Sequence, residues 1–408
     1  MIKFLSNIRG DKVIWLVVII LTVFSLLAVY SSTGTLAYRY QQGNTEYYLF
    51  KQFIILIFGI GLMYIAHLVK YTYYSRISQL AMFIAVPLLM FTLFTGTNVH
   101  EASRWLTLPV INLTFQSSDF AKLALIIYVA RLLSKKQEQI KDFKSAFIPI
   151  MVPILIVCGL ILPANLSTAA ALFVTCMTML FIGRINMKYI FALLGIAVVL
   201  LGFFILILMN SSSQGRLGTW KNRTEAYLGI GDSTNRDDLY QVEQAKIAIA
   251  TGGVIGKFPG NSTQRNFLPH PYSDFIYAII VEEYGLIGAI VVVLMYMILL
   301  FRGVKIVSQA PGTFGAFLTF GCCFSLVFQA FINMAVAVNI FPVTGQPLPM
   351  VSMGGTSIWF TGIAIGIMLS VSKETEKENE LMEVEKKKKE ETKDNEEKTN
   401  GEEKEKKE

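Results

Sequence analysis

Ten long apolar runs follow one another along the chain and restrict it to one kind of fold. The runs cover 13–31, 52–69, 79–95, 119–134, 146–163, 168–183, 189–209, 275–301, 313–336 and 358–372. About 20 apolar residues in a helix cross a bilayer core about 30 Å thick. Backbone polar groups in that core must pair within the protein, which favours helices as spanning segments. The sequence therefore predicts an all-α polytopic membrane protein with about ten transmembrane helices.

Charged residues are rare in most of the chain and concentrated at its end. Only 16% of the 408 residues are charged, whereas soluble domains carry about 25%. Residues 373–408 hold 11 Lys and 15 Asp or Glu and no aromatic residue. This composition excludes a soluble globular protein. It predicts a membrane domain over residues 1–372, followed by a disordered, charged cytoplasmic tail over residues 373–408.

Lys and Arg in the short connections predict how the chain crosses the membrane, because cytoplasmic connections are enriched in these residues. With the N-terminus inside, the cytoplasmic side receives Lys3, Arg9, Lys12, Lys70, Arg76, Lys135, Lys136, Lys141, Lys144, Arg184, Lys188, Arg302 and Lys305. Arg39 falls in the first of the short outer connections and Arg104 in the second, and the connections 163–167 and 337–357 contain no Lys or Arg. Both termini are therefore expected in the cytoplasm. This distribution explains the net charge of +7 without nucleic acid as a partner.

Two stretches interrupt the alternation of span and short connection, and both are expected on the outer side. Residues 210–273 form a large polar loop between spans 7 and 8, in which 239–250 resembles a short amphipathic helix closed by two Gly residues. Residues 339–357 contain three Pro and three Gly and no Lys or Arg, so they cannot form a regular helix. Irregular backbone at membrane depth is tolerated where it lines a cavity. We therefore expect a functional site on the outer face.

Asp274 is the first candidate for chemistry, because it stands where the large loop enters the next span. A carboxylate at the mouth of a partly dry cavity can act as a general base. The same residue also suits the start of a helix, where a negative charge interacts favourably with the helix dipole. From the residues alone, both interpretations stay open.

Few other ionisable residues fall near the predicted outer face, and such residues in spans are functional candidates. Lys122 and Arg104 either bind an anion or extend their charged ends to the membrane surface. Glu283 either pairs with Lys122 or contacts a substrate. A cavity lined by cations and carboxylates beside lipid suits an amphiphilic substrate with an anionic head. The residues do not separate an enzyme from a transporter of such a substrate.

Four segments form an ordered set of motifs. The first comprises Arg104-Trp105-Leu106, Gln116-Ser117-Ser118-Asp119 and Lys122, and the second is Pro163-Ala164-Asn165-Leu166-Ser167-Thr168-Ala169. The third begins at Tyr240-Gln241 and includes Gly260–Gln264, Ser273-Asp274-Phe275-Ile276 and Glu282-Glu283-Tyr284-Gly285. The fourth comprises Asn333 and Pro342–Ser357. Over residues 10–372 the chain resembles the SEDS family (shape, elongation, division and sporulation), the FtsW/RodA/SpoVE type, and is closest to its cell-division type.

The resemblance implies a peptidoglycan glycosyltransferase that polymerises lipid II, the undecaprenyl-diphosphate-linked disaccharide peptide, at the outer face of the bacterial cytoplasmic membrane. It implies two kinds of partner, a class B penicillin-binding protein transpeptidase and other divisome membrane proteins at the septum. The family's essential aspartate falls on Asp274, as general base. The candidate substrate-binding residues are Arg104, Lys122, Arg216, Gln264, Glu283, Ser352, Gly354 and Gly355. Mg²⁺ or Mn²⁺ could assist the departing diphosphate, although no dedicated set of metal ligands is visible in the sequence.

The sequence departs from the family pattern without losing the proposed base. Asn165 replaces an Asp, Asp119 replaces a Glu, and His270 and Tyr272 replace an acid and a His. A mechanism that needs a carboxylate at position 165 or 270 is therefore not supported. A lipid II flippase, an elongation-type polymerase and a non-catalytic scaffold remain as alternatives. Ionisable residues that cluster in the outer half favour a polymerase over a flippase.

Overall fold

The computed structural model describes residues 9–95, 97–99, 102–108, 113–210, 218, 220–221, 223–224, 227 and 236–405. One helix coincides with each predicted apolar run: α2 (Lys12–Ser32), α4 (Thr45–Leu68), α5 (Tyr71–Thr95), α6 (Ser117–Lys135), α7 (Ile148–Ile161), α8 (Leu166–Ile182), α9 (Met187–Asn210), α12 (Ile276–Gln309), α13 (Thr313–Ala337) and α14 (Thr356–Glu405). Within this part of the chain, eight helices are long and apolar enough to cross a membrane. The all-α polytopic membrane fold is confirmed. The count of ten spans stays a prediction, because α8 is shorter and α6 carries charged residues.

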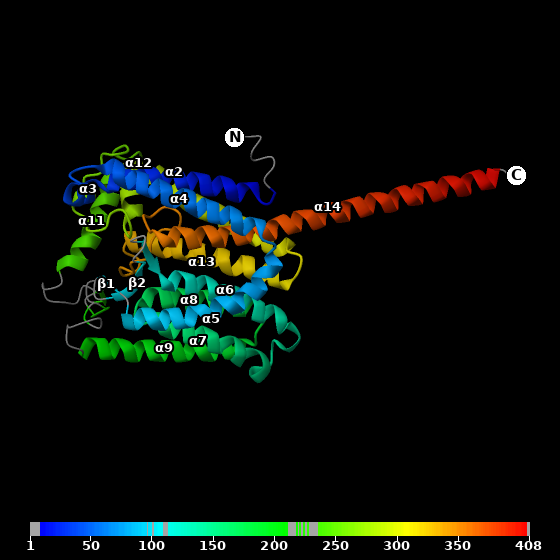
Figure 1. Cartoon of the computed structure of the whole chain (residues 1–408), viewed down its shortest axis with the longest axis horizontal. Helices are drawn as coiled ribbons and strands as arrows, with labels where there is room; N and C mark the ends of the chain where they lie inside the picture. Colours follow the sequence, from blue (N-terminus) through cyan, green and yellow to red (C-terminus); the bar gives the residue numbers. More distant parts are fainter. Residues whose placement is uncertain are drawn as a thin grey trace.

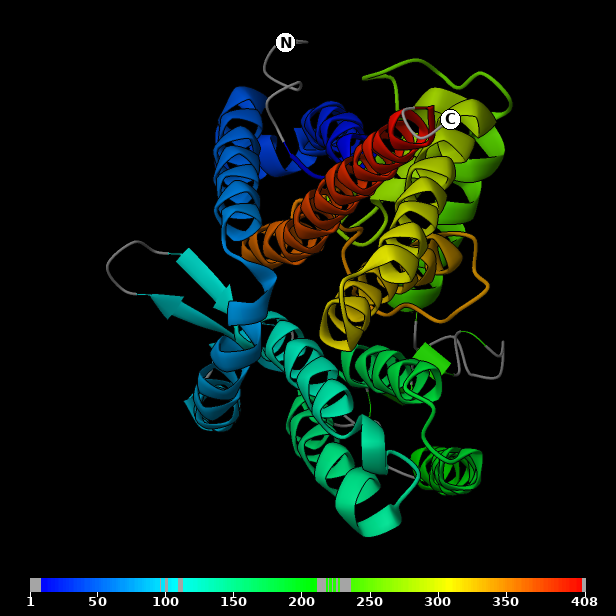
Figure 2. The ribbon, with the colours of Figure 1, turned by 90° about the vertical axis from the view of Figure 1, so that its right-hand side faces the viewer.

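Helix α13 connects two groups of helices that Figure 2 shows one above the other. It packs against α12 and α14 of the upper group and against α6 and α8 of the lower group. Helix α9 lies at the edge of the lower group, where it contacts α8 and leaves most of its apolar side chains exposed. An apolar helix exposed in this way is suited to face lipid.

Polar side chains define where several helices begin. Asp11 Oδ1 accepts a hydrogen bond from the amide of Val13 at 2.9 Å, and Asn44 caps α4 in the same way. Asn165 caps α8 by accepting from the amide of Thr168 at 3.3 Å. Each cap satisfies an amide that has no partner within its own helix. The cap at Asn165 explains how α7 and α8 form a hairpin with almost no loop, as the sequence predicts.

A small antiparallel sheet, which the hydropathy pattern does not predict, precedes α6. Its strands are β1 (Thr97–Val99), β2 (Ala102–Leu108) and β3 (Leu113–Gln116), in the order β1-β2-β3. Pairing of β2 with β3 runs from Trp105 and Gln116 to Leu108 and Leu113. Figure 1 places β1 and β2 at the same end of the bundle as α3 (Gly34–Tyr40) and α11 (Arg236–Gly252). This is the end that the sequence predicts to be outer.

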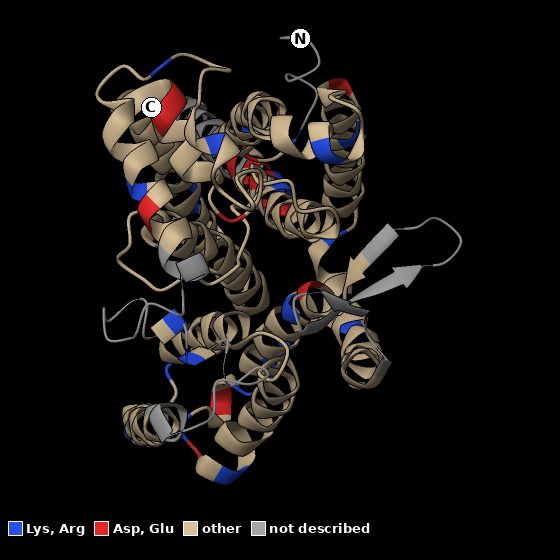
Figure 3. Cartoon of the chain, turned by 90° about the vertical axis from the view of Figure 1, so that its left-hand side faces the viewer, with Lys and Arg blue, Asp and Glu red and all other residues tan. Residues whose placement is uncertain are grey.

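The predicted irregular segments are present at this end. Helix α11 contains the short helix expected at 239–250, and Gly253 follows it with a φ of 55°, so the predicted Gly stop is confirmed. The short helix η3 (Gln264–Asn266) follows. Residues 339–355 form no helix, and positive φ angles occur at Asn339, Gly345, Met350 and Gly355. Figure 3, which looks onto this end, shows that charged residues are sparse over the bundle.

Helix α12 is broken at Gly285, whose φ of 66° and ψ of −164° are not helical. The segment 253–257 pairs with the break. Leu286 N donates to Gly253 O at 3.0 Å, and Lys257 N donates to Glu282 O at 2.9 Å. A Cβ on Gly285 would lie 2.3 Å from Val254 O, so no other residue fits here. Backbone groups freed by the break are thus satisfied by the large loop.

The opposite end holds the start of α2 and the tail. Asp11 pairs with Arg302 at 2.6 Å, and Gly10 N donates to Glu376 at 2.8 Å, which joins the N-terminus to α12 and α14. Helix α14 then continues to Glu405 and projects from the bundle (Figure 1), where the sequence predicted a disordered tail. The physical reason for this difference is composition, because the tail is rich in Lys and Glu, which are good helix formers, and has no Pro.

Candidate active site

Asp274 lies in the turn immediately before α12, at the predicted outer end. Its carboxylate accepts a hydrogen bond from Ser273 Oγ at 2.7 Å. Asn333 of α13 donates to its backbone carbonyl at 3.0 Å. The side chain is half-buried, whereas the next residue, Phe275, is 1% exposed. Among the described residues no ion pair holds this carboxylate, and the turn fixes the position of Asp274.

The irregular segment 339–355 is bonded directly to this turn. Met353 N donates to Tyr272 O at 2.9 Å, and Ser352 Oγ donates to Ser273 O at 2.6 Å. The Ser352 hydroxyl also accepts from Leu348 N at 2.7 Å. Ser352, predicted to contact substrate, therefore uses its hydroxyl within the fold to hold the backbone beside Asp274.

Two amide side chains, one turn apart on α13, connect this segment to charged residues. Asn333 Nδ2 donates to Asp274 O and also to Gln346 O at 2.8 Å. Gln329 Nε2 donates to Pro347 O at 2.9 Å, and its Oε1 accepts from Lys122 Nζ at 2.8 Å. Helix α13 thereby sets the position of Asp274 relative to Lys122.

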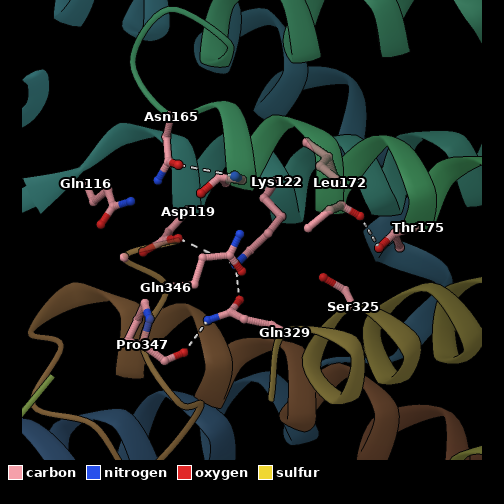
Figure 4. A pocket seen from close by; sticks show the side chains of 13 residues that line it. Gln116, Asp119, Lys122, Asn165, Leu172, Thr175, Ser325, Gln329, Gln346 and Pro347 are labelled. Atoms are coloured by element: carbon pink, nitrogen blue, oxygen red, sulfur yellow. Dashed lines mark hydrogen bonds and ion pairs between the residues drawn. The ribbon is translucent and has the colours of Figure 1, made fainter. Parts of the chain in front are cut away.

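A narrow polar cavity opens beside Gln329, between α6, α8, α13 and the irregular segment (Figure 4). Its empty volume is about 390 Å³, which includes space open to solvent. The lining residues are Gln116, Asp119, Lys122, Asn165, Thr168, Ala171, Leu172, Thr175, Ser325, Gln329, Gly345, Gln346 and Pro347. Residues from three of the four motif segments thus meet in one place.

The charges that line this cavity are balanced. Lys122 Nζ lies 3.5 Å from Asp119 Oδ1, and both side chains are largely buried. Asp119 Oδ2 and Gln346 Nε2 have no hydrogen-bond partner within the described part of the chain, although both residues are only 5% exposed. Buried polar atoms are nearly always satisfied in proteins. An acceptor and a donor are therefore both available to water or to a polar ligand.

Glu283 does not pair with Lys122, so that interpretation of the sequence is wrong. Glu283 accepts from the Ser31 hydroxyl and from Ser262 N at 3.3 Å. Its neighbour Glu282 pairs with Lys257 at 2.7 Å. The physical reason is the packing of the helices. Helix α13 contacts both α6, which carries Lys122, and α12, which carries Glu283. Lys122 pairs with Asp119 of its own helix instead. Both glutamates are buried and join the large loop to α12.

The remaining predicted residues are dispersed. Arg104 belongs to β2, and Arg216 lies outside the described residues. Gln264 N approaches the Glu282 carboxylate at 3.3 Å, and its buried Oε1 has no partner among the described residues. Gly354 and Gly355 immediately precede α14, and their carbonyls accept from the first turn of that helix. Their predicted contacts with substrate stay predictions.

The part of the chain that the structure describes contains no group of three or more His, Cys, Asp and Glu side chains that could hold a metal ion. In the cavity, the side chains that most resemble a set of metal ligands are the Asp119 carboxylate and the Asn165 amide. Lys122 competes for that carboxylate, since it already lies 3.5 Å from Asp119 Oδ1. These residues do not form a dedicated divalent cation site.

Sequence reasoning missed the roles of Gln329, Asn333 and Gln346. The first two stand four residues apart in an otherwise apolar helix, so they share one face. Polar side chains inside a span are a recognised mark of function. That spacing was the available signal, but it does not reveal which distant carbonyls the two amides bind.

The fold and the site define a polytopic all-α membrane protein with a buried polar network beside a half-buried carboxylate. Residues 11–377 match the family described as cell cycle protein, which groups the FtsW, RodA and SpoVE proteins. The chain belongs to this family.

Relatives of similar length align with nearly the whole chain. It is 36% identical to the probable peptidoglycan glycosyltransferase FtsW of Geobacter metallireducens, over 89% of this chain and 95% of that protein. It is 31% identical to stage V sporulation protein E of Bacillus subtilis, over 89% of this chain and 97% of that protein.

Solved structures share the fold at lower identity. A chain of a peptidoglycan synthase complex, studied for the coordination of polymerization and crosslinking, matches with a TM-score of 0.70 at 20% identity, over 89% of this chain and 98% of that chain. The rod shape determining protein RodA of Thermus thermophilus matches with a TM-score of 0.64 at 20% identity, over 91% and 99%.

Proposed function

We propose that this protein, which its family and relatives identify as a peptidoglycan glycosyltransferase, polymerises lipid II at the outer face of the cytoplasmic membrane, with Asp274 as general base. The observation that carries the proposal is the hydrogen-bond network from Asp274 through Asn333, Gln346 and Pro347 to Gln329 and Lys122. It connects the backbone of Asp274, whose carboxylate has no ion pair among the described residues, to a polar cavity. The names of the relatives support the same activity.

The reaction needs one proton transfer at the acceptor. Asp274 takes the proton of the acceptor sugar's 4-hydroxyl as its oxygen attacks the anomeric carbon of the donor. The bond from that carbon to the diphosphate oxygen breaks, and undecaprenyl diphosphate leaves with the electron pair. Ser273 donates to one carboxylate oxygen, which leaves the other oxygen to receive the proton.

Negative charge builds on the leaving diphosphate, and cations stabilise it. Lys122, Arg104 and Arg216 are the proposed cations. Lys122 is already bonded to Asp119 and Gln329, so it would act as part of a neutral network rather than as an isolated charge. The two arginines would then supply most of the charge for the diphosphate.

The cellular setting is part of the proposal. The family's description as cell cycle protein and the FtsW relatives support a role in septal synthesis. The similarity to a chain of a peptidoglycan synthase complex supports a class B penicillin-binding protein as partner. The distribution of Lys and Arg supports a cytoplasmic position of both termini. Helix α2 begins and the tail leaves at the same end of the bundle, which agrees with this orientation.

The test is a polymerisation assay with the purified full chain, its cognate transpeptidase and lipid II, with and without Mg²⁺ or Mn²⁺. Asp274→Asn should abolish glycan chains, with a loss of at least about 100-fold, as expected for removal of a general base. The matched control is Glu243→Gln, which alters an exposed carboxylate of α11 and should leave the rate unchanged.

Two outcomes would contradict the proposal. Full polymerisation by Asp274→Asn would exclude Asp274 as the base. Transfer of lipid II between leaflets without glycan formation by the wild-type protein would identify a flippase instead.

A further inference from the structure

Two buried polar side chains from the first two long helices are bonded to the irregular segment 339–355. Ser25 of α2 donates its hydroxyl to Val351 O at 2.8 Å, and its oxygen accepts from Gln52 Nε2 of α4 at 2.8 Å. All three residues are fully buried. Neither Ser25 nor Gln52 lines the polar cavity beside Gln329. Polar side chains inside spans are functional candidates, so this pair needs a role of its own.

The Gln52 amide determines which bond the Ser25 hydroxyl makes. A serine or threonine hydroxyl has one hydrogen to donate, and inside a helix it often donates to the carbonyl four residues earlier. Thr22 of the same helix makes that bond, to Val18 O at 2.7 Å. Because Gln52 donates to the Ser25 oxygen, the hydroxyl hydrogen is directed to Val351 O instead.

The segment that receives this bond holds one residue in an unfavourable backbone conformation. Met350 has a φ of 63°, in the left-handed region that residues with a side chain seldom adopt. The carbonyls on both sides of Met350 accept from buried hydroxyls. Pro349 O accepts from Tyr296 Oη at 2.6 Å, and Val351 O accepts from Ser25. Strained backbone persists where the surrounding structure fixes it, so Tyr296 and Ser25 together hold the bend at Met350.

The residue directly after Val351 is bonded to the turn that carries Asp274. Ser352 Oγ donates to Ser273 O at 2.6 Å. A change in the position of Val351 therefore moves Ser352, and Ser352 in turn moves the residue that precedes Asp274. Three hydrogen bonds thus connect Gln52 on α4 to this turn.

We propose that Gln52 and Ser25 are positioning residues for Asp274, which act through Val351 and Ser352. They do not touch the reacting atoms. They hold the turn in the geometry in which the Asp274 carboxylate meets the acceptor hydroxyl, so they contribute to the rate rather than to substrate affinity. This inference rests on the proposed function, because that function assigns Asp274 as the base.

The competing explanation is that the pair only satisfies polar groups buried within two spans. In that case each substitution changes stability, and the kinetics of the folded protein stay the same. Gln52 Oε1 has no partner among the described residues. A side chain whose role is only to satisfy buried groups gains nothing from an acceptor that itself stays unsatisfied, which favours the positioning role.

The experiment uses the full chain in lipid nanodiscs with its cognate transpeptidase and lipid II. Gln52→Met keeps the length of the side chain but removes the donor, so the Ser25 hydroxyl is free to bond within its own helix. Ser25→Ala removes the bond to Val351 O. Each change should lower kcat about tenfold and leave KM within about twofold, because a displaced reacting group affects the rate most. Thr22→Val, which removes a hydroxyl bonded within α2, is the matched control and should leave both constants unchanged.

Combined variants test the path. Ser352→Ala removes the next bond of the path, so adding Ser25→Ala to it should lower kcat by less than about twofold further. Independent effects of the two residues would multiply instead. Hydrogen exchange provides a readout without activity. The amide of Met353, which donates to Tyr272 O, should exchange faster in Ser25→Ala than in the wild type.

Gln52→Met should accelerate the same exchange, and Thr22→Val should not. Wild-type kcat in both Gln52→Met and Ser25→Ala, or unchanged exchange of the Met353 amide in both, would overturn the positioning role. If Ser25→Ala does not fold, Gln52→Met carries the test, because it leaves the Ser25 hydroxyl in place. The proposed function fails separately, through full polymerisation by Asp274→Asn, and the exchange measurement does not depend on polymerisation.

Discussion

One amide of Asn333 donates to two carbonyls, that of Asp274 at 3.0 Å and that of Gln346 at 2.8 Å. The proposed base and the irregular segment are thereby held by the same side chain. Asn333 is 1% exposed, and its Oδ1 has no partner in the described part of the chain. Its contribution therefore lies in its two donors.

Replacing Asn333 should lower kcat more than it raises KM, because the change displaces Asp274 rather than a substrate contact. Asn333→Ala leaves two carbonyls unsatisfied, which costs about 1–3 kcal/mol of stability. Asn333→Asp should be worse, since its carboxylate would face both carbonyls. Polymerisation kinetics and thermal unfolding measure these effects.

The control on the same helix is Thr319→Val. Thr319 is fully buried, and its hydroxyl has no partner among the described residues, so this change should be neutral or stabilising. Equal activity of Asn333→Asp and wild type would refute the positioning role.

The pair Asp119–Lys122 allows a double-mutant cycle. Lys122→Met leaves Asp119 buried without its partner and should destabilise the protein by about 3 kcal/mol. Adding Asp119→Asn should restore much of that stability but not the polymerisation rate, if Lys122 also serves the diphosphate. Recovery of full activity in the double variant would assign the pair a structural role alone.

The break in α12 should be intolerant of any side chain at Gly285. Gly285→Ala places a Cβ against Val254 O, and it also forces Ala into a φ/ψ region that almost only Gly adopts. Together the clash and the backbone strain should lower the free energy of unfolding by at least about 3 kcal/mol. We expect little folded protein in detergent, measured by size-exclusion profile. Gly61→Ala in α4, where a Cβ meets nothing within 4 Å, should fold normally.

Removing residues 386–408 should leave stability and polymerisation unchanged. Residues 376–385 are exposed, and the bonds that anchor this end come from Asp11, Arg302 and Glu376, which the shortened chain keeps. Arg302→Met, in contrast, leaves Asp11 without its cation and should cost about 2 kcal/mol. A large loss of unfolding temperature on truncation would mean that the distal tail does contact the membrane domain.

The sequence was sufficient for the helices, the irregular segment 339–355 and the location of Asp274, because hydropathy, Pro and Gly act locally. It was not sufficient for β1–β3, since short strands of mixed composition carry no clear period. The helical tail was missed because a Lys- and Glu-rich segment suits both a solvated coil and an exposed helix.

The site network depended on pairs far apart in the chain. Lys122 and Gln329 are separated by 207 residues, and Ser31 and Glu283 by 252. Charge alone suggested that Glu283 would pair with Lys122, but the order of packed helices decides which charges meet. Only the three-dimensional arrangement supplies that order.

The backbone pairing between segment 253–257 and the broken α12 has a consequence for biogenesis. The loop precedes its partner helix in the sequence, so synthesis delivers the Gly253 carbonyl before the Leu286 amide that it accepts from. In the proposed orientation, the loop must be translocated before the part of α12 that precedes the break at Gly285 can take its final position in the bilayer. Insertion of this span is thus expected to be coupled to export of the loop, rather than to follow from its hydrophobicity alone.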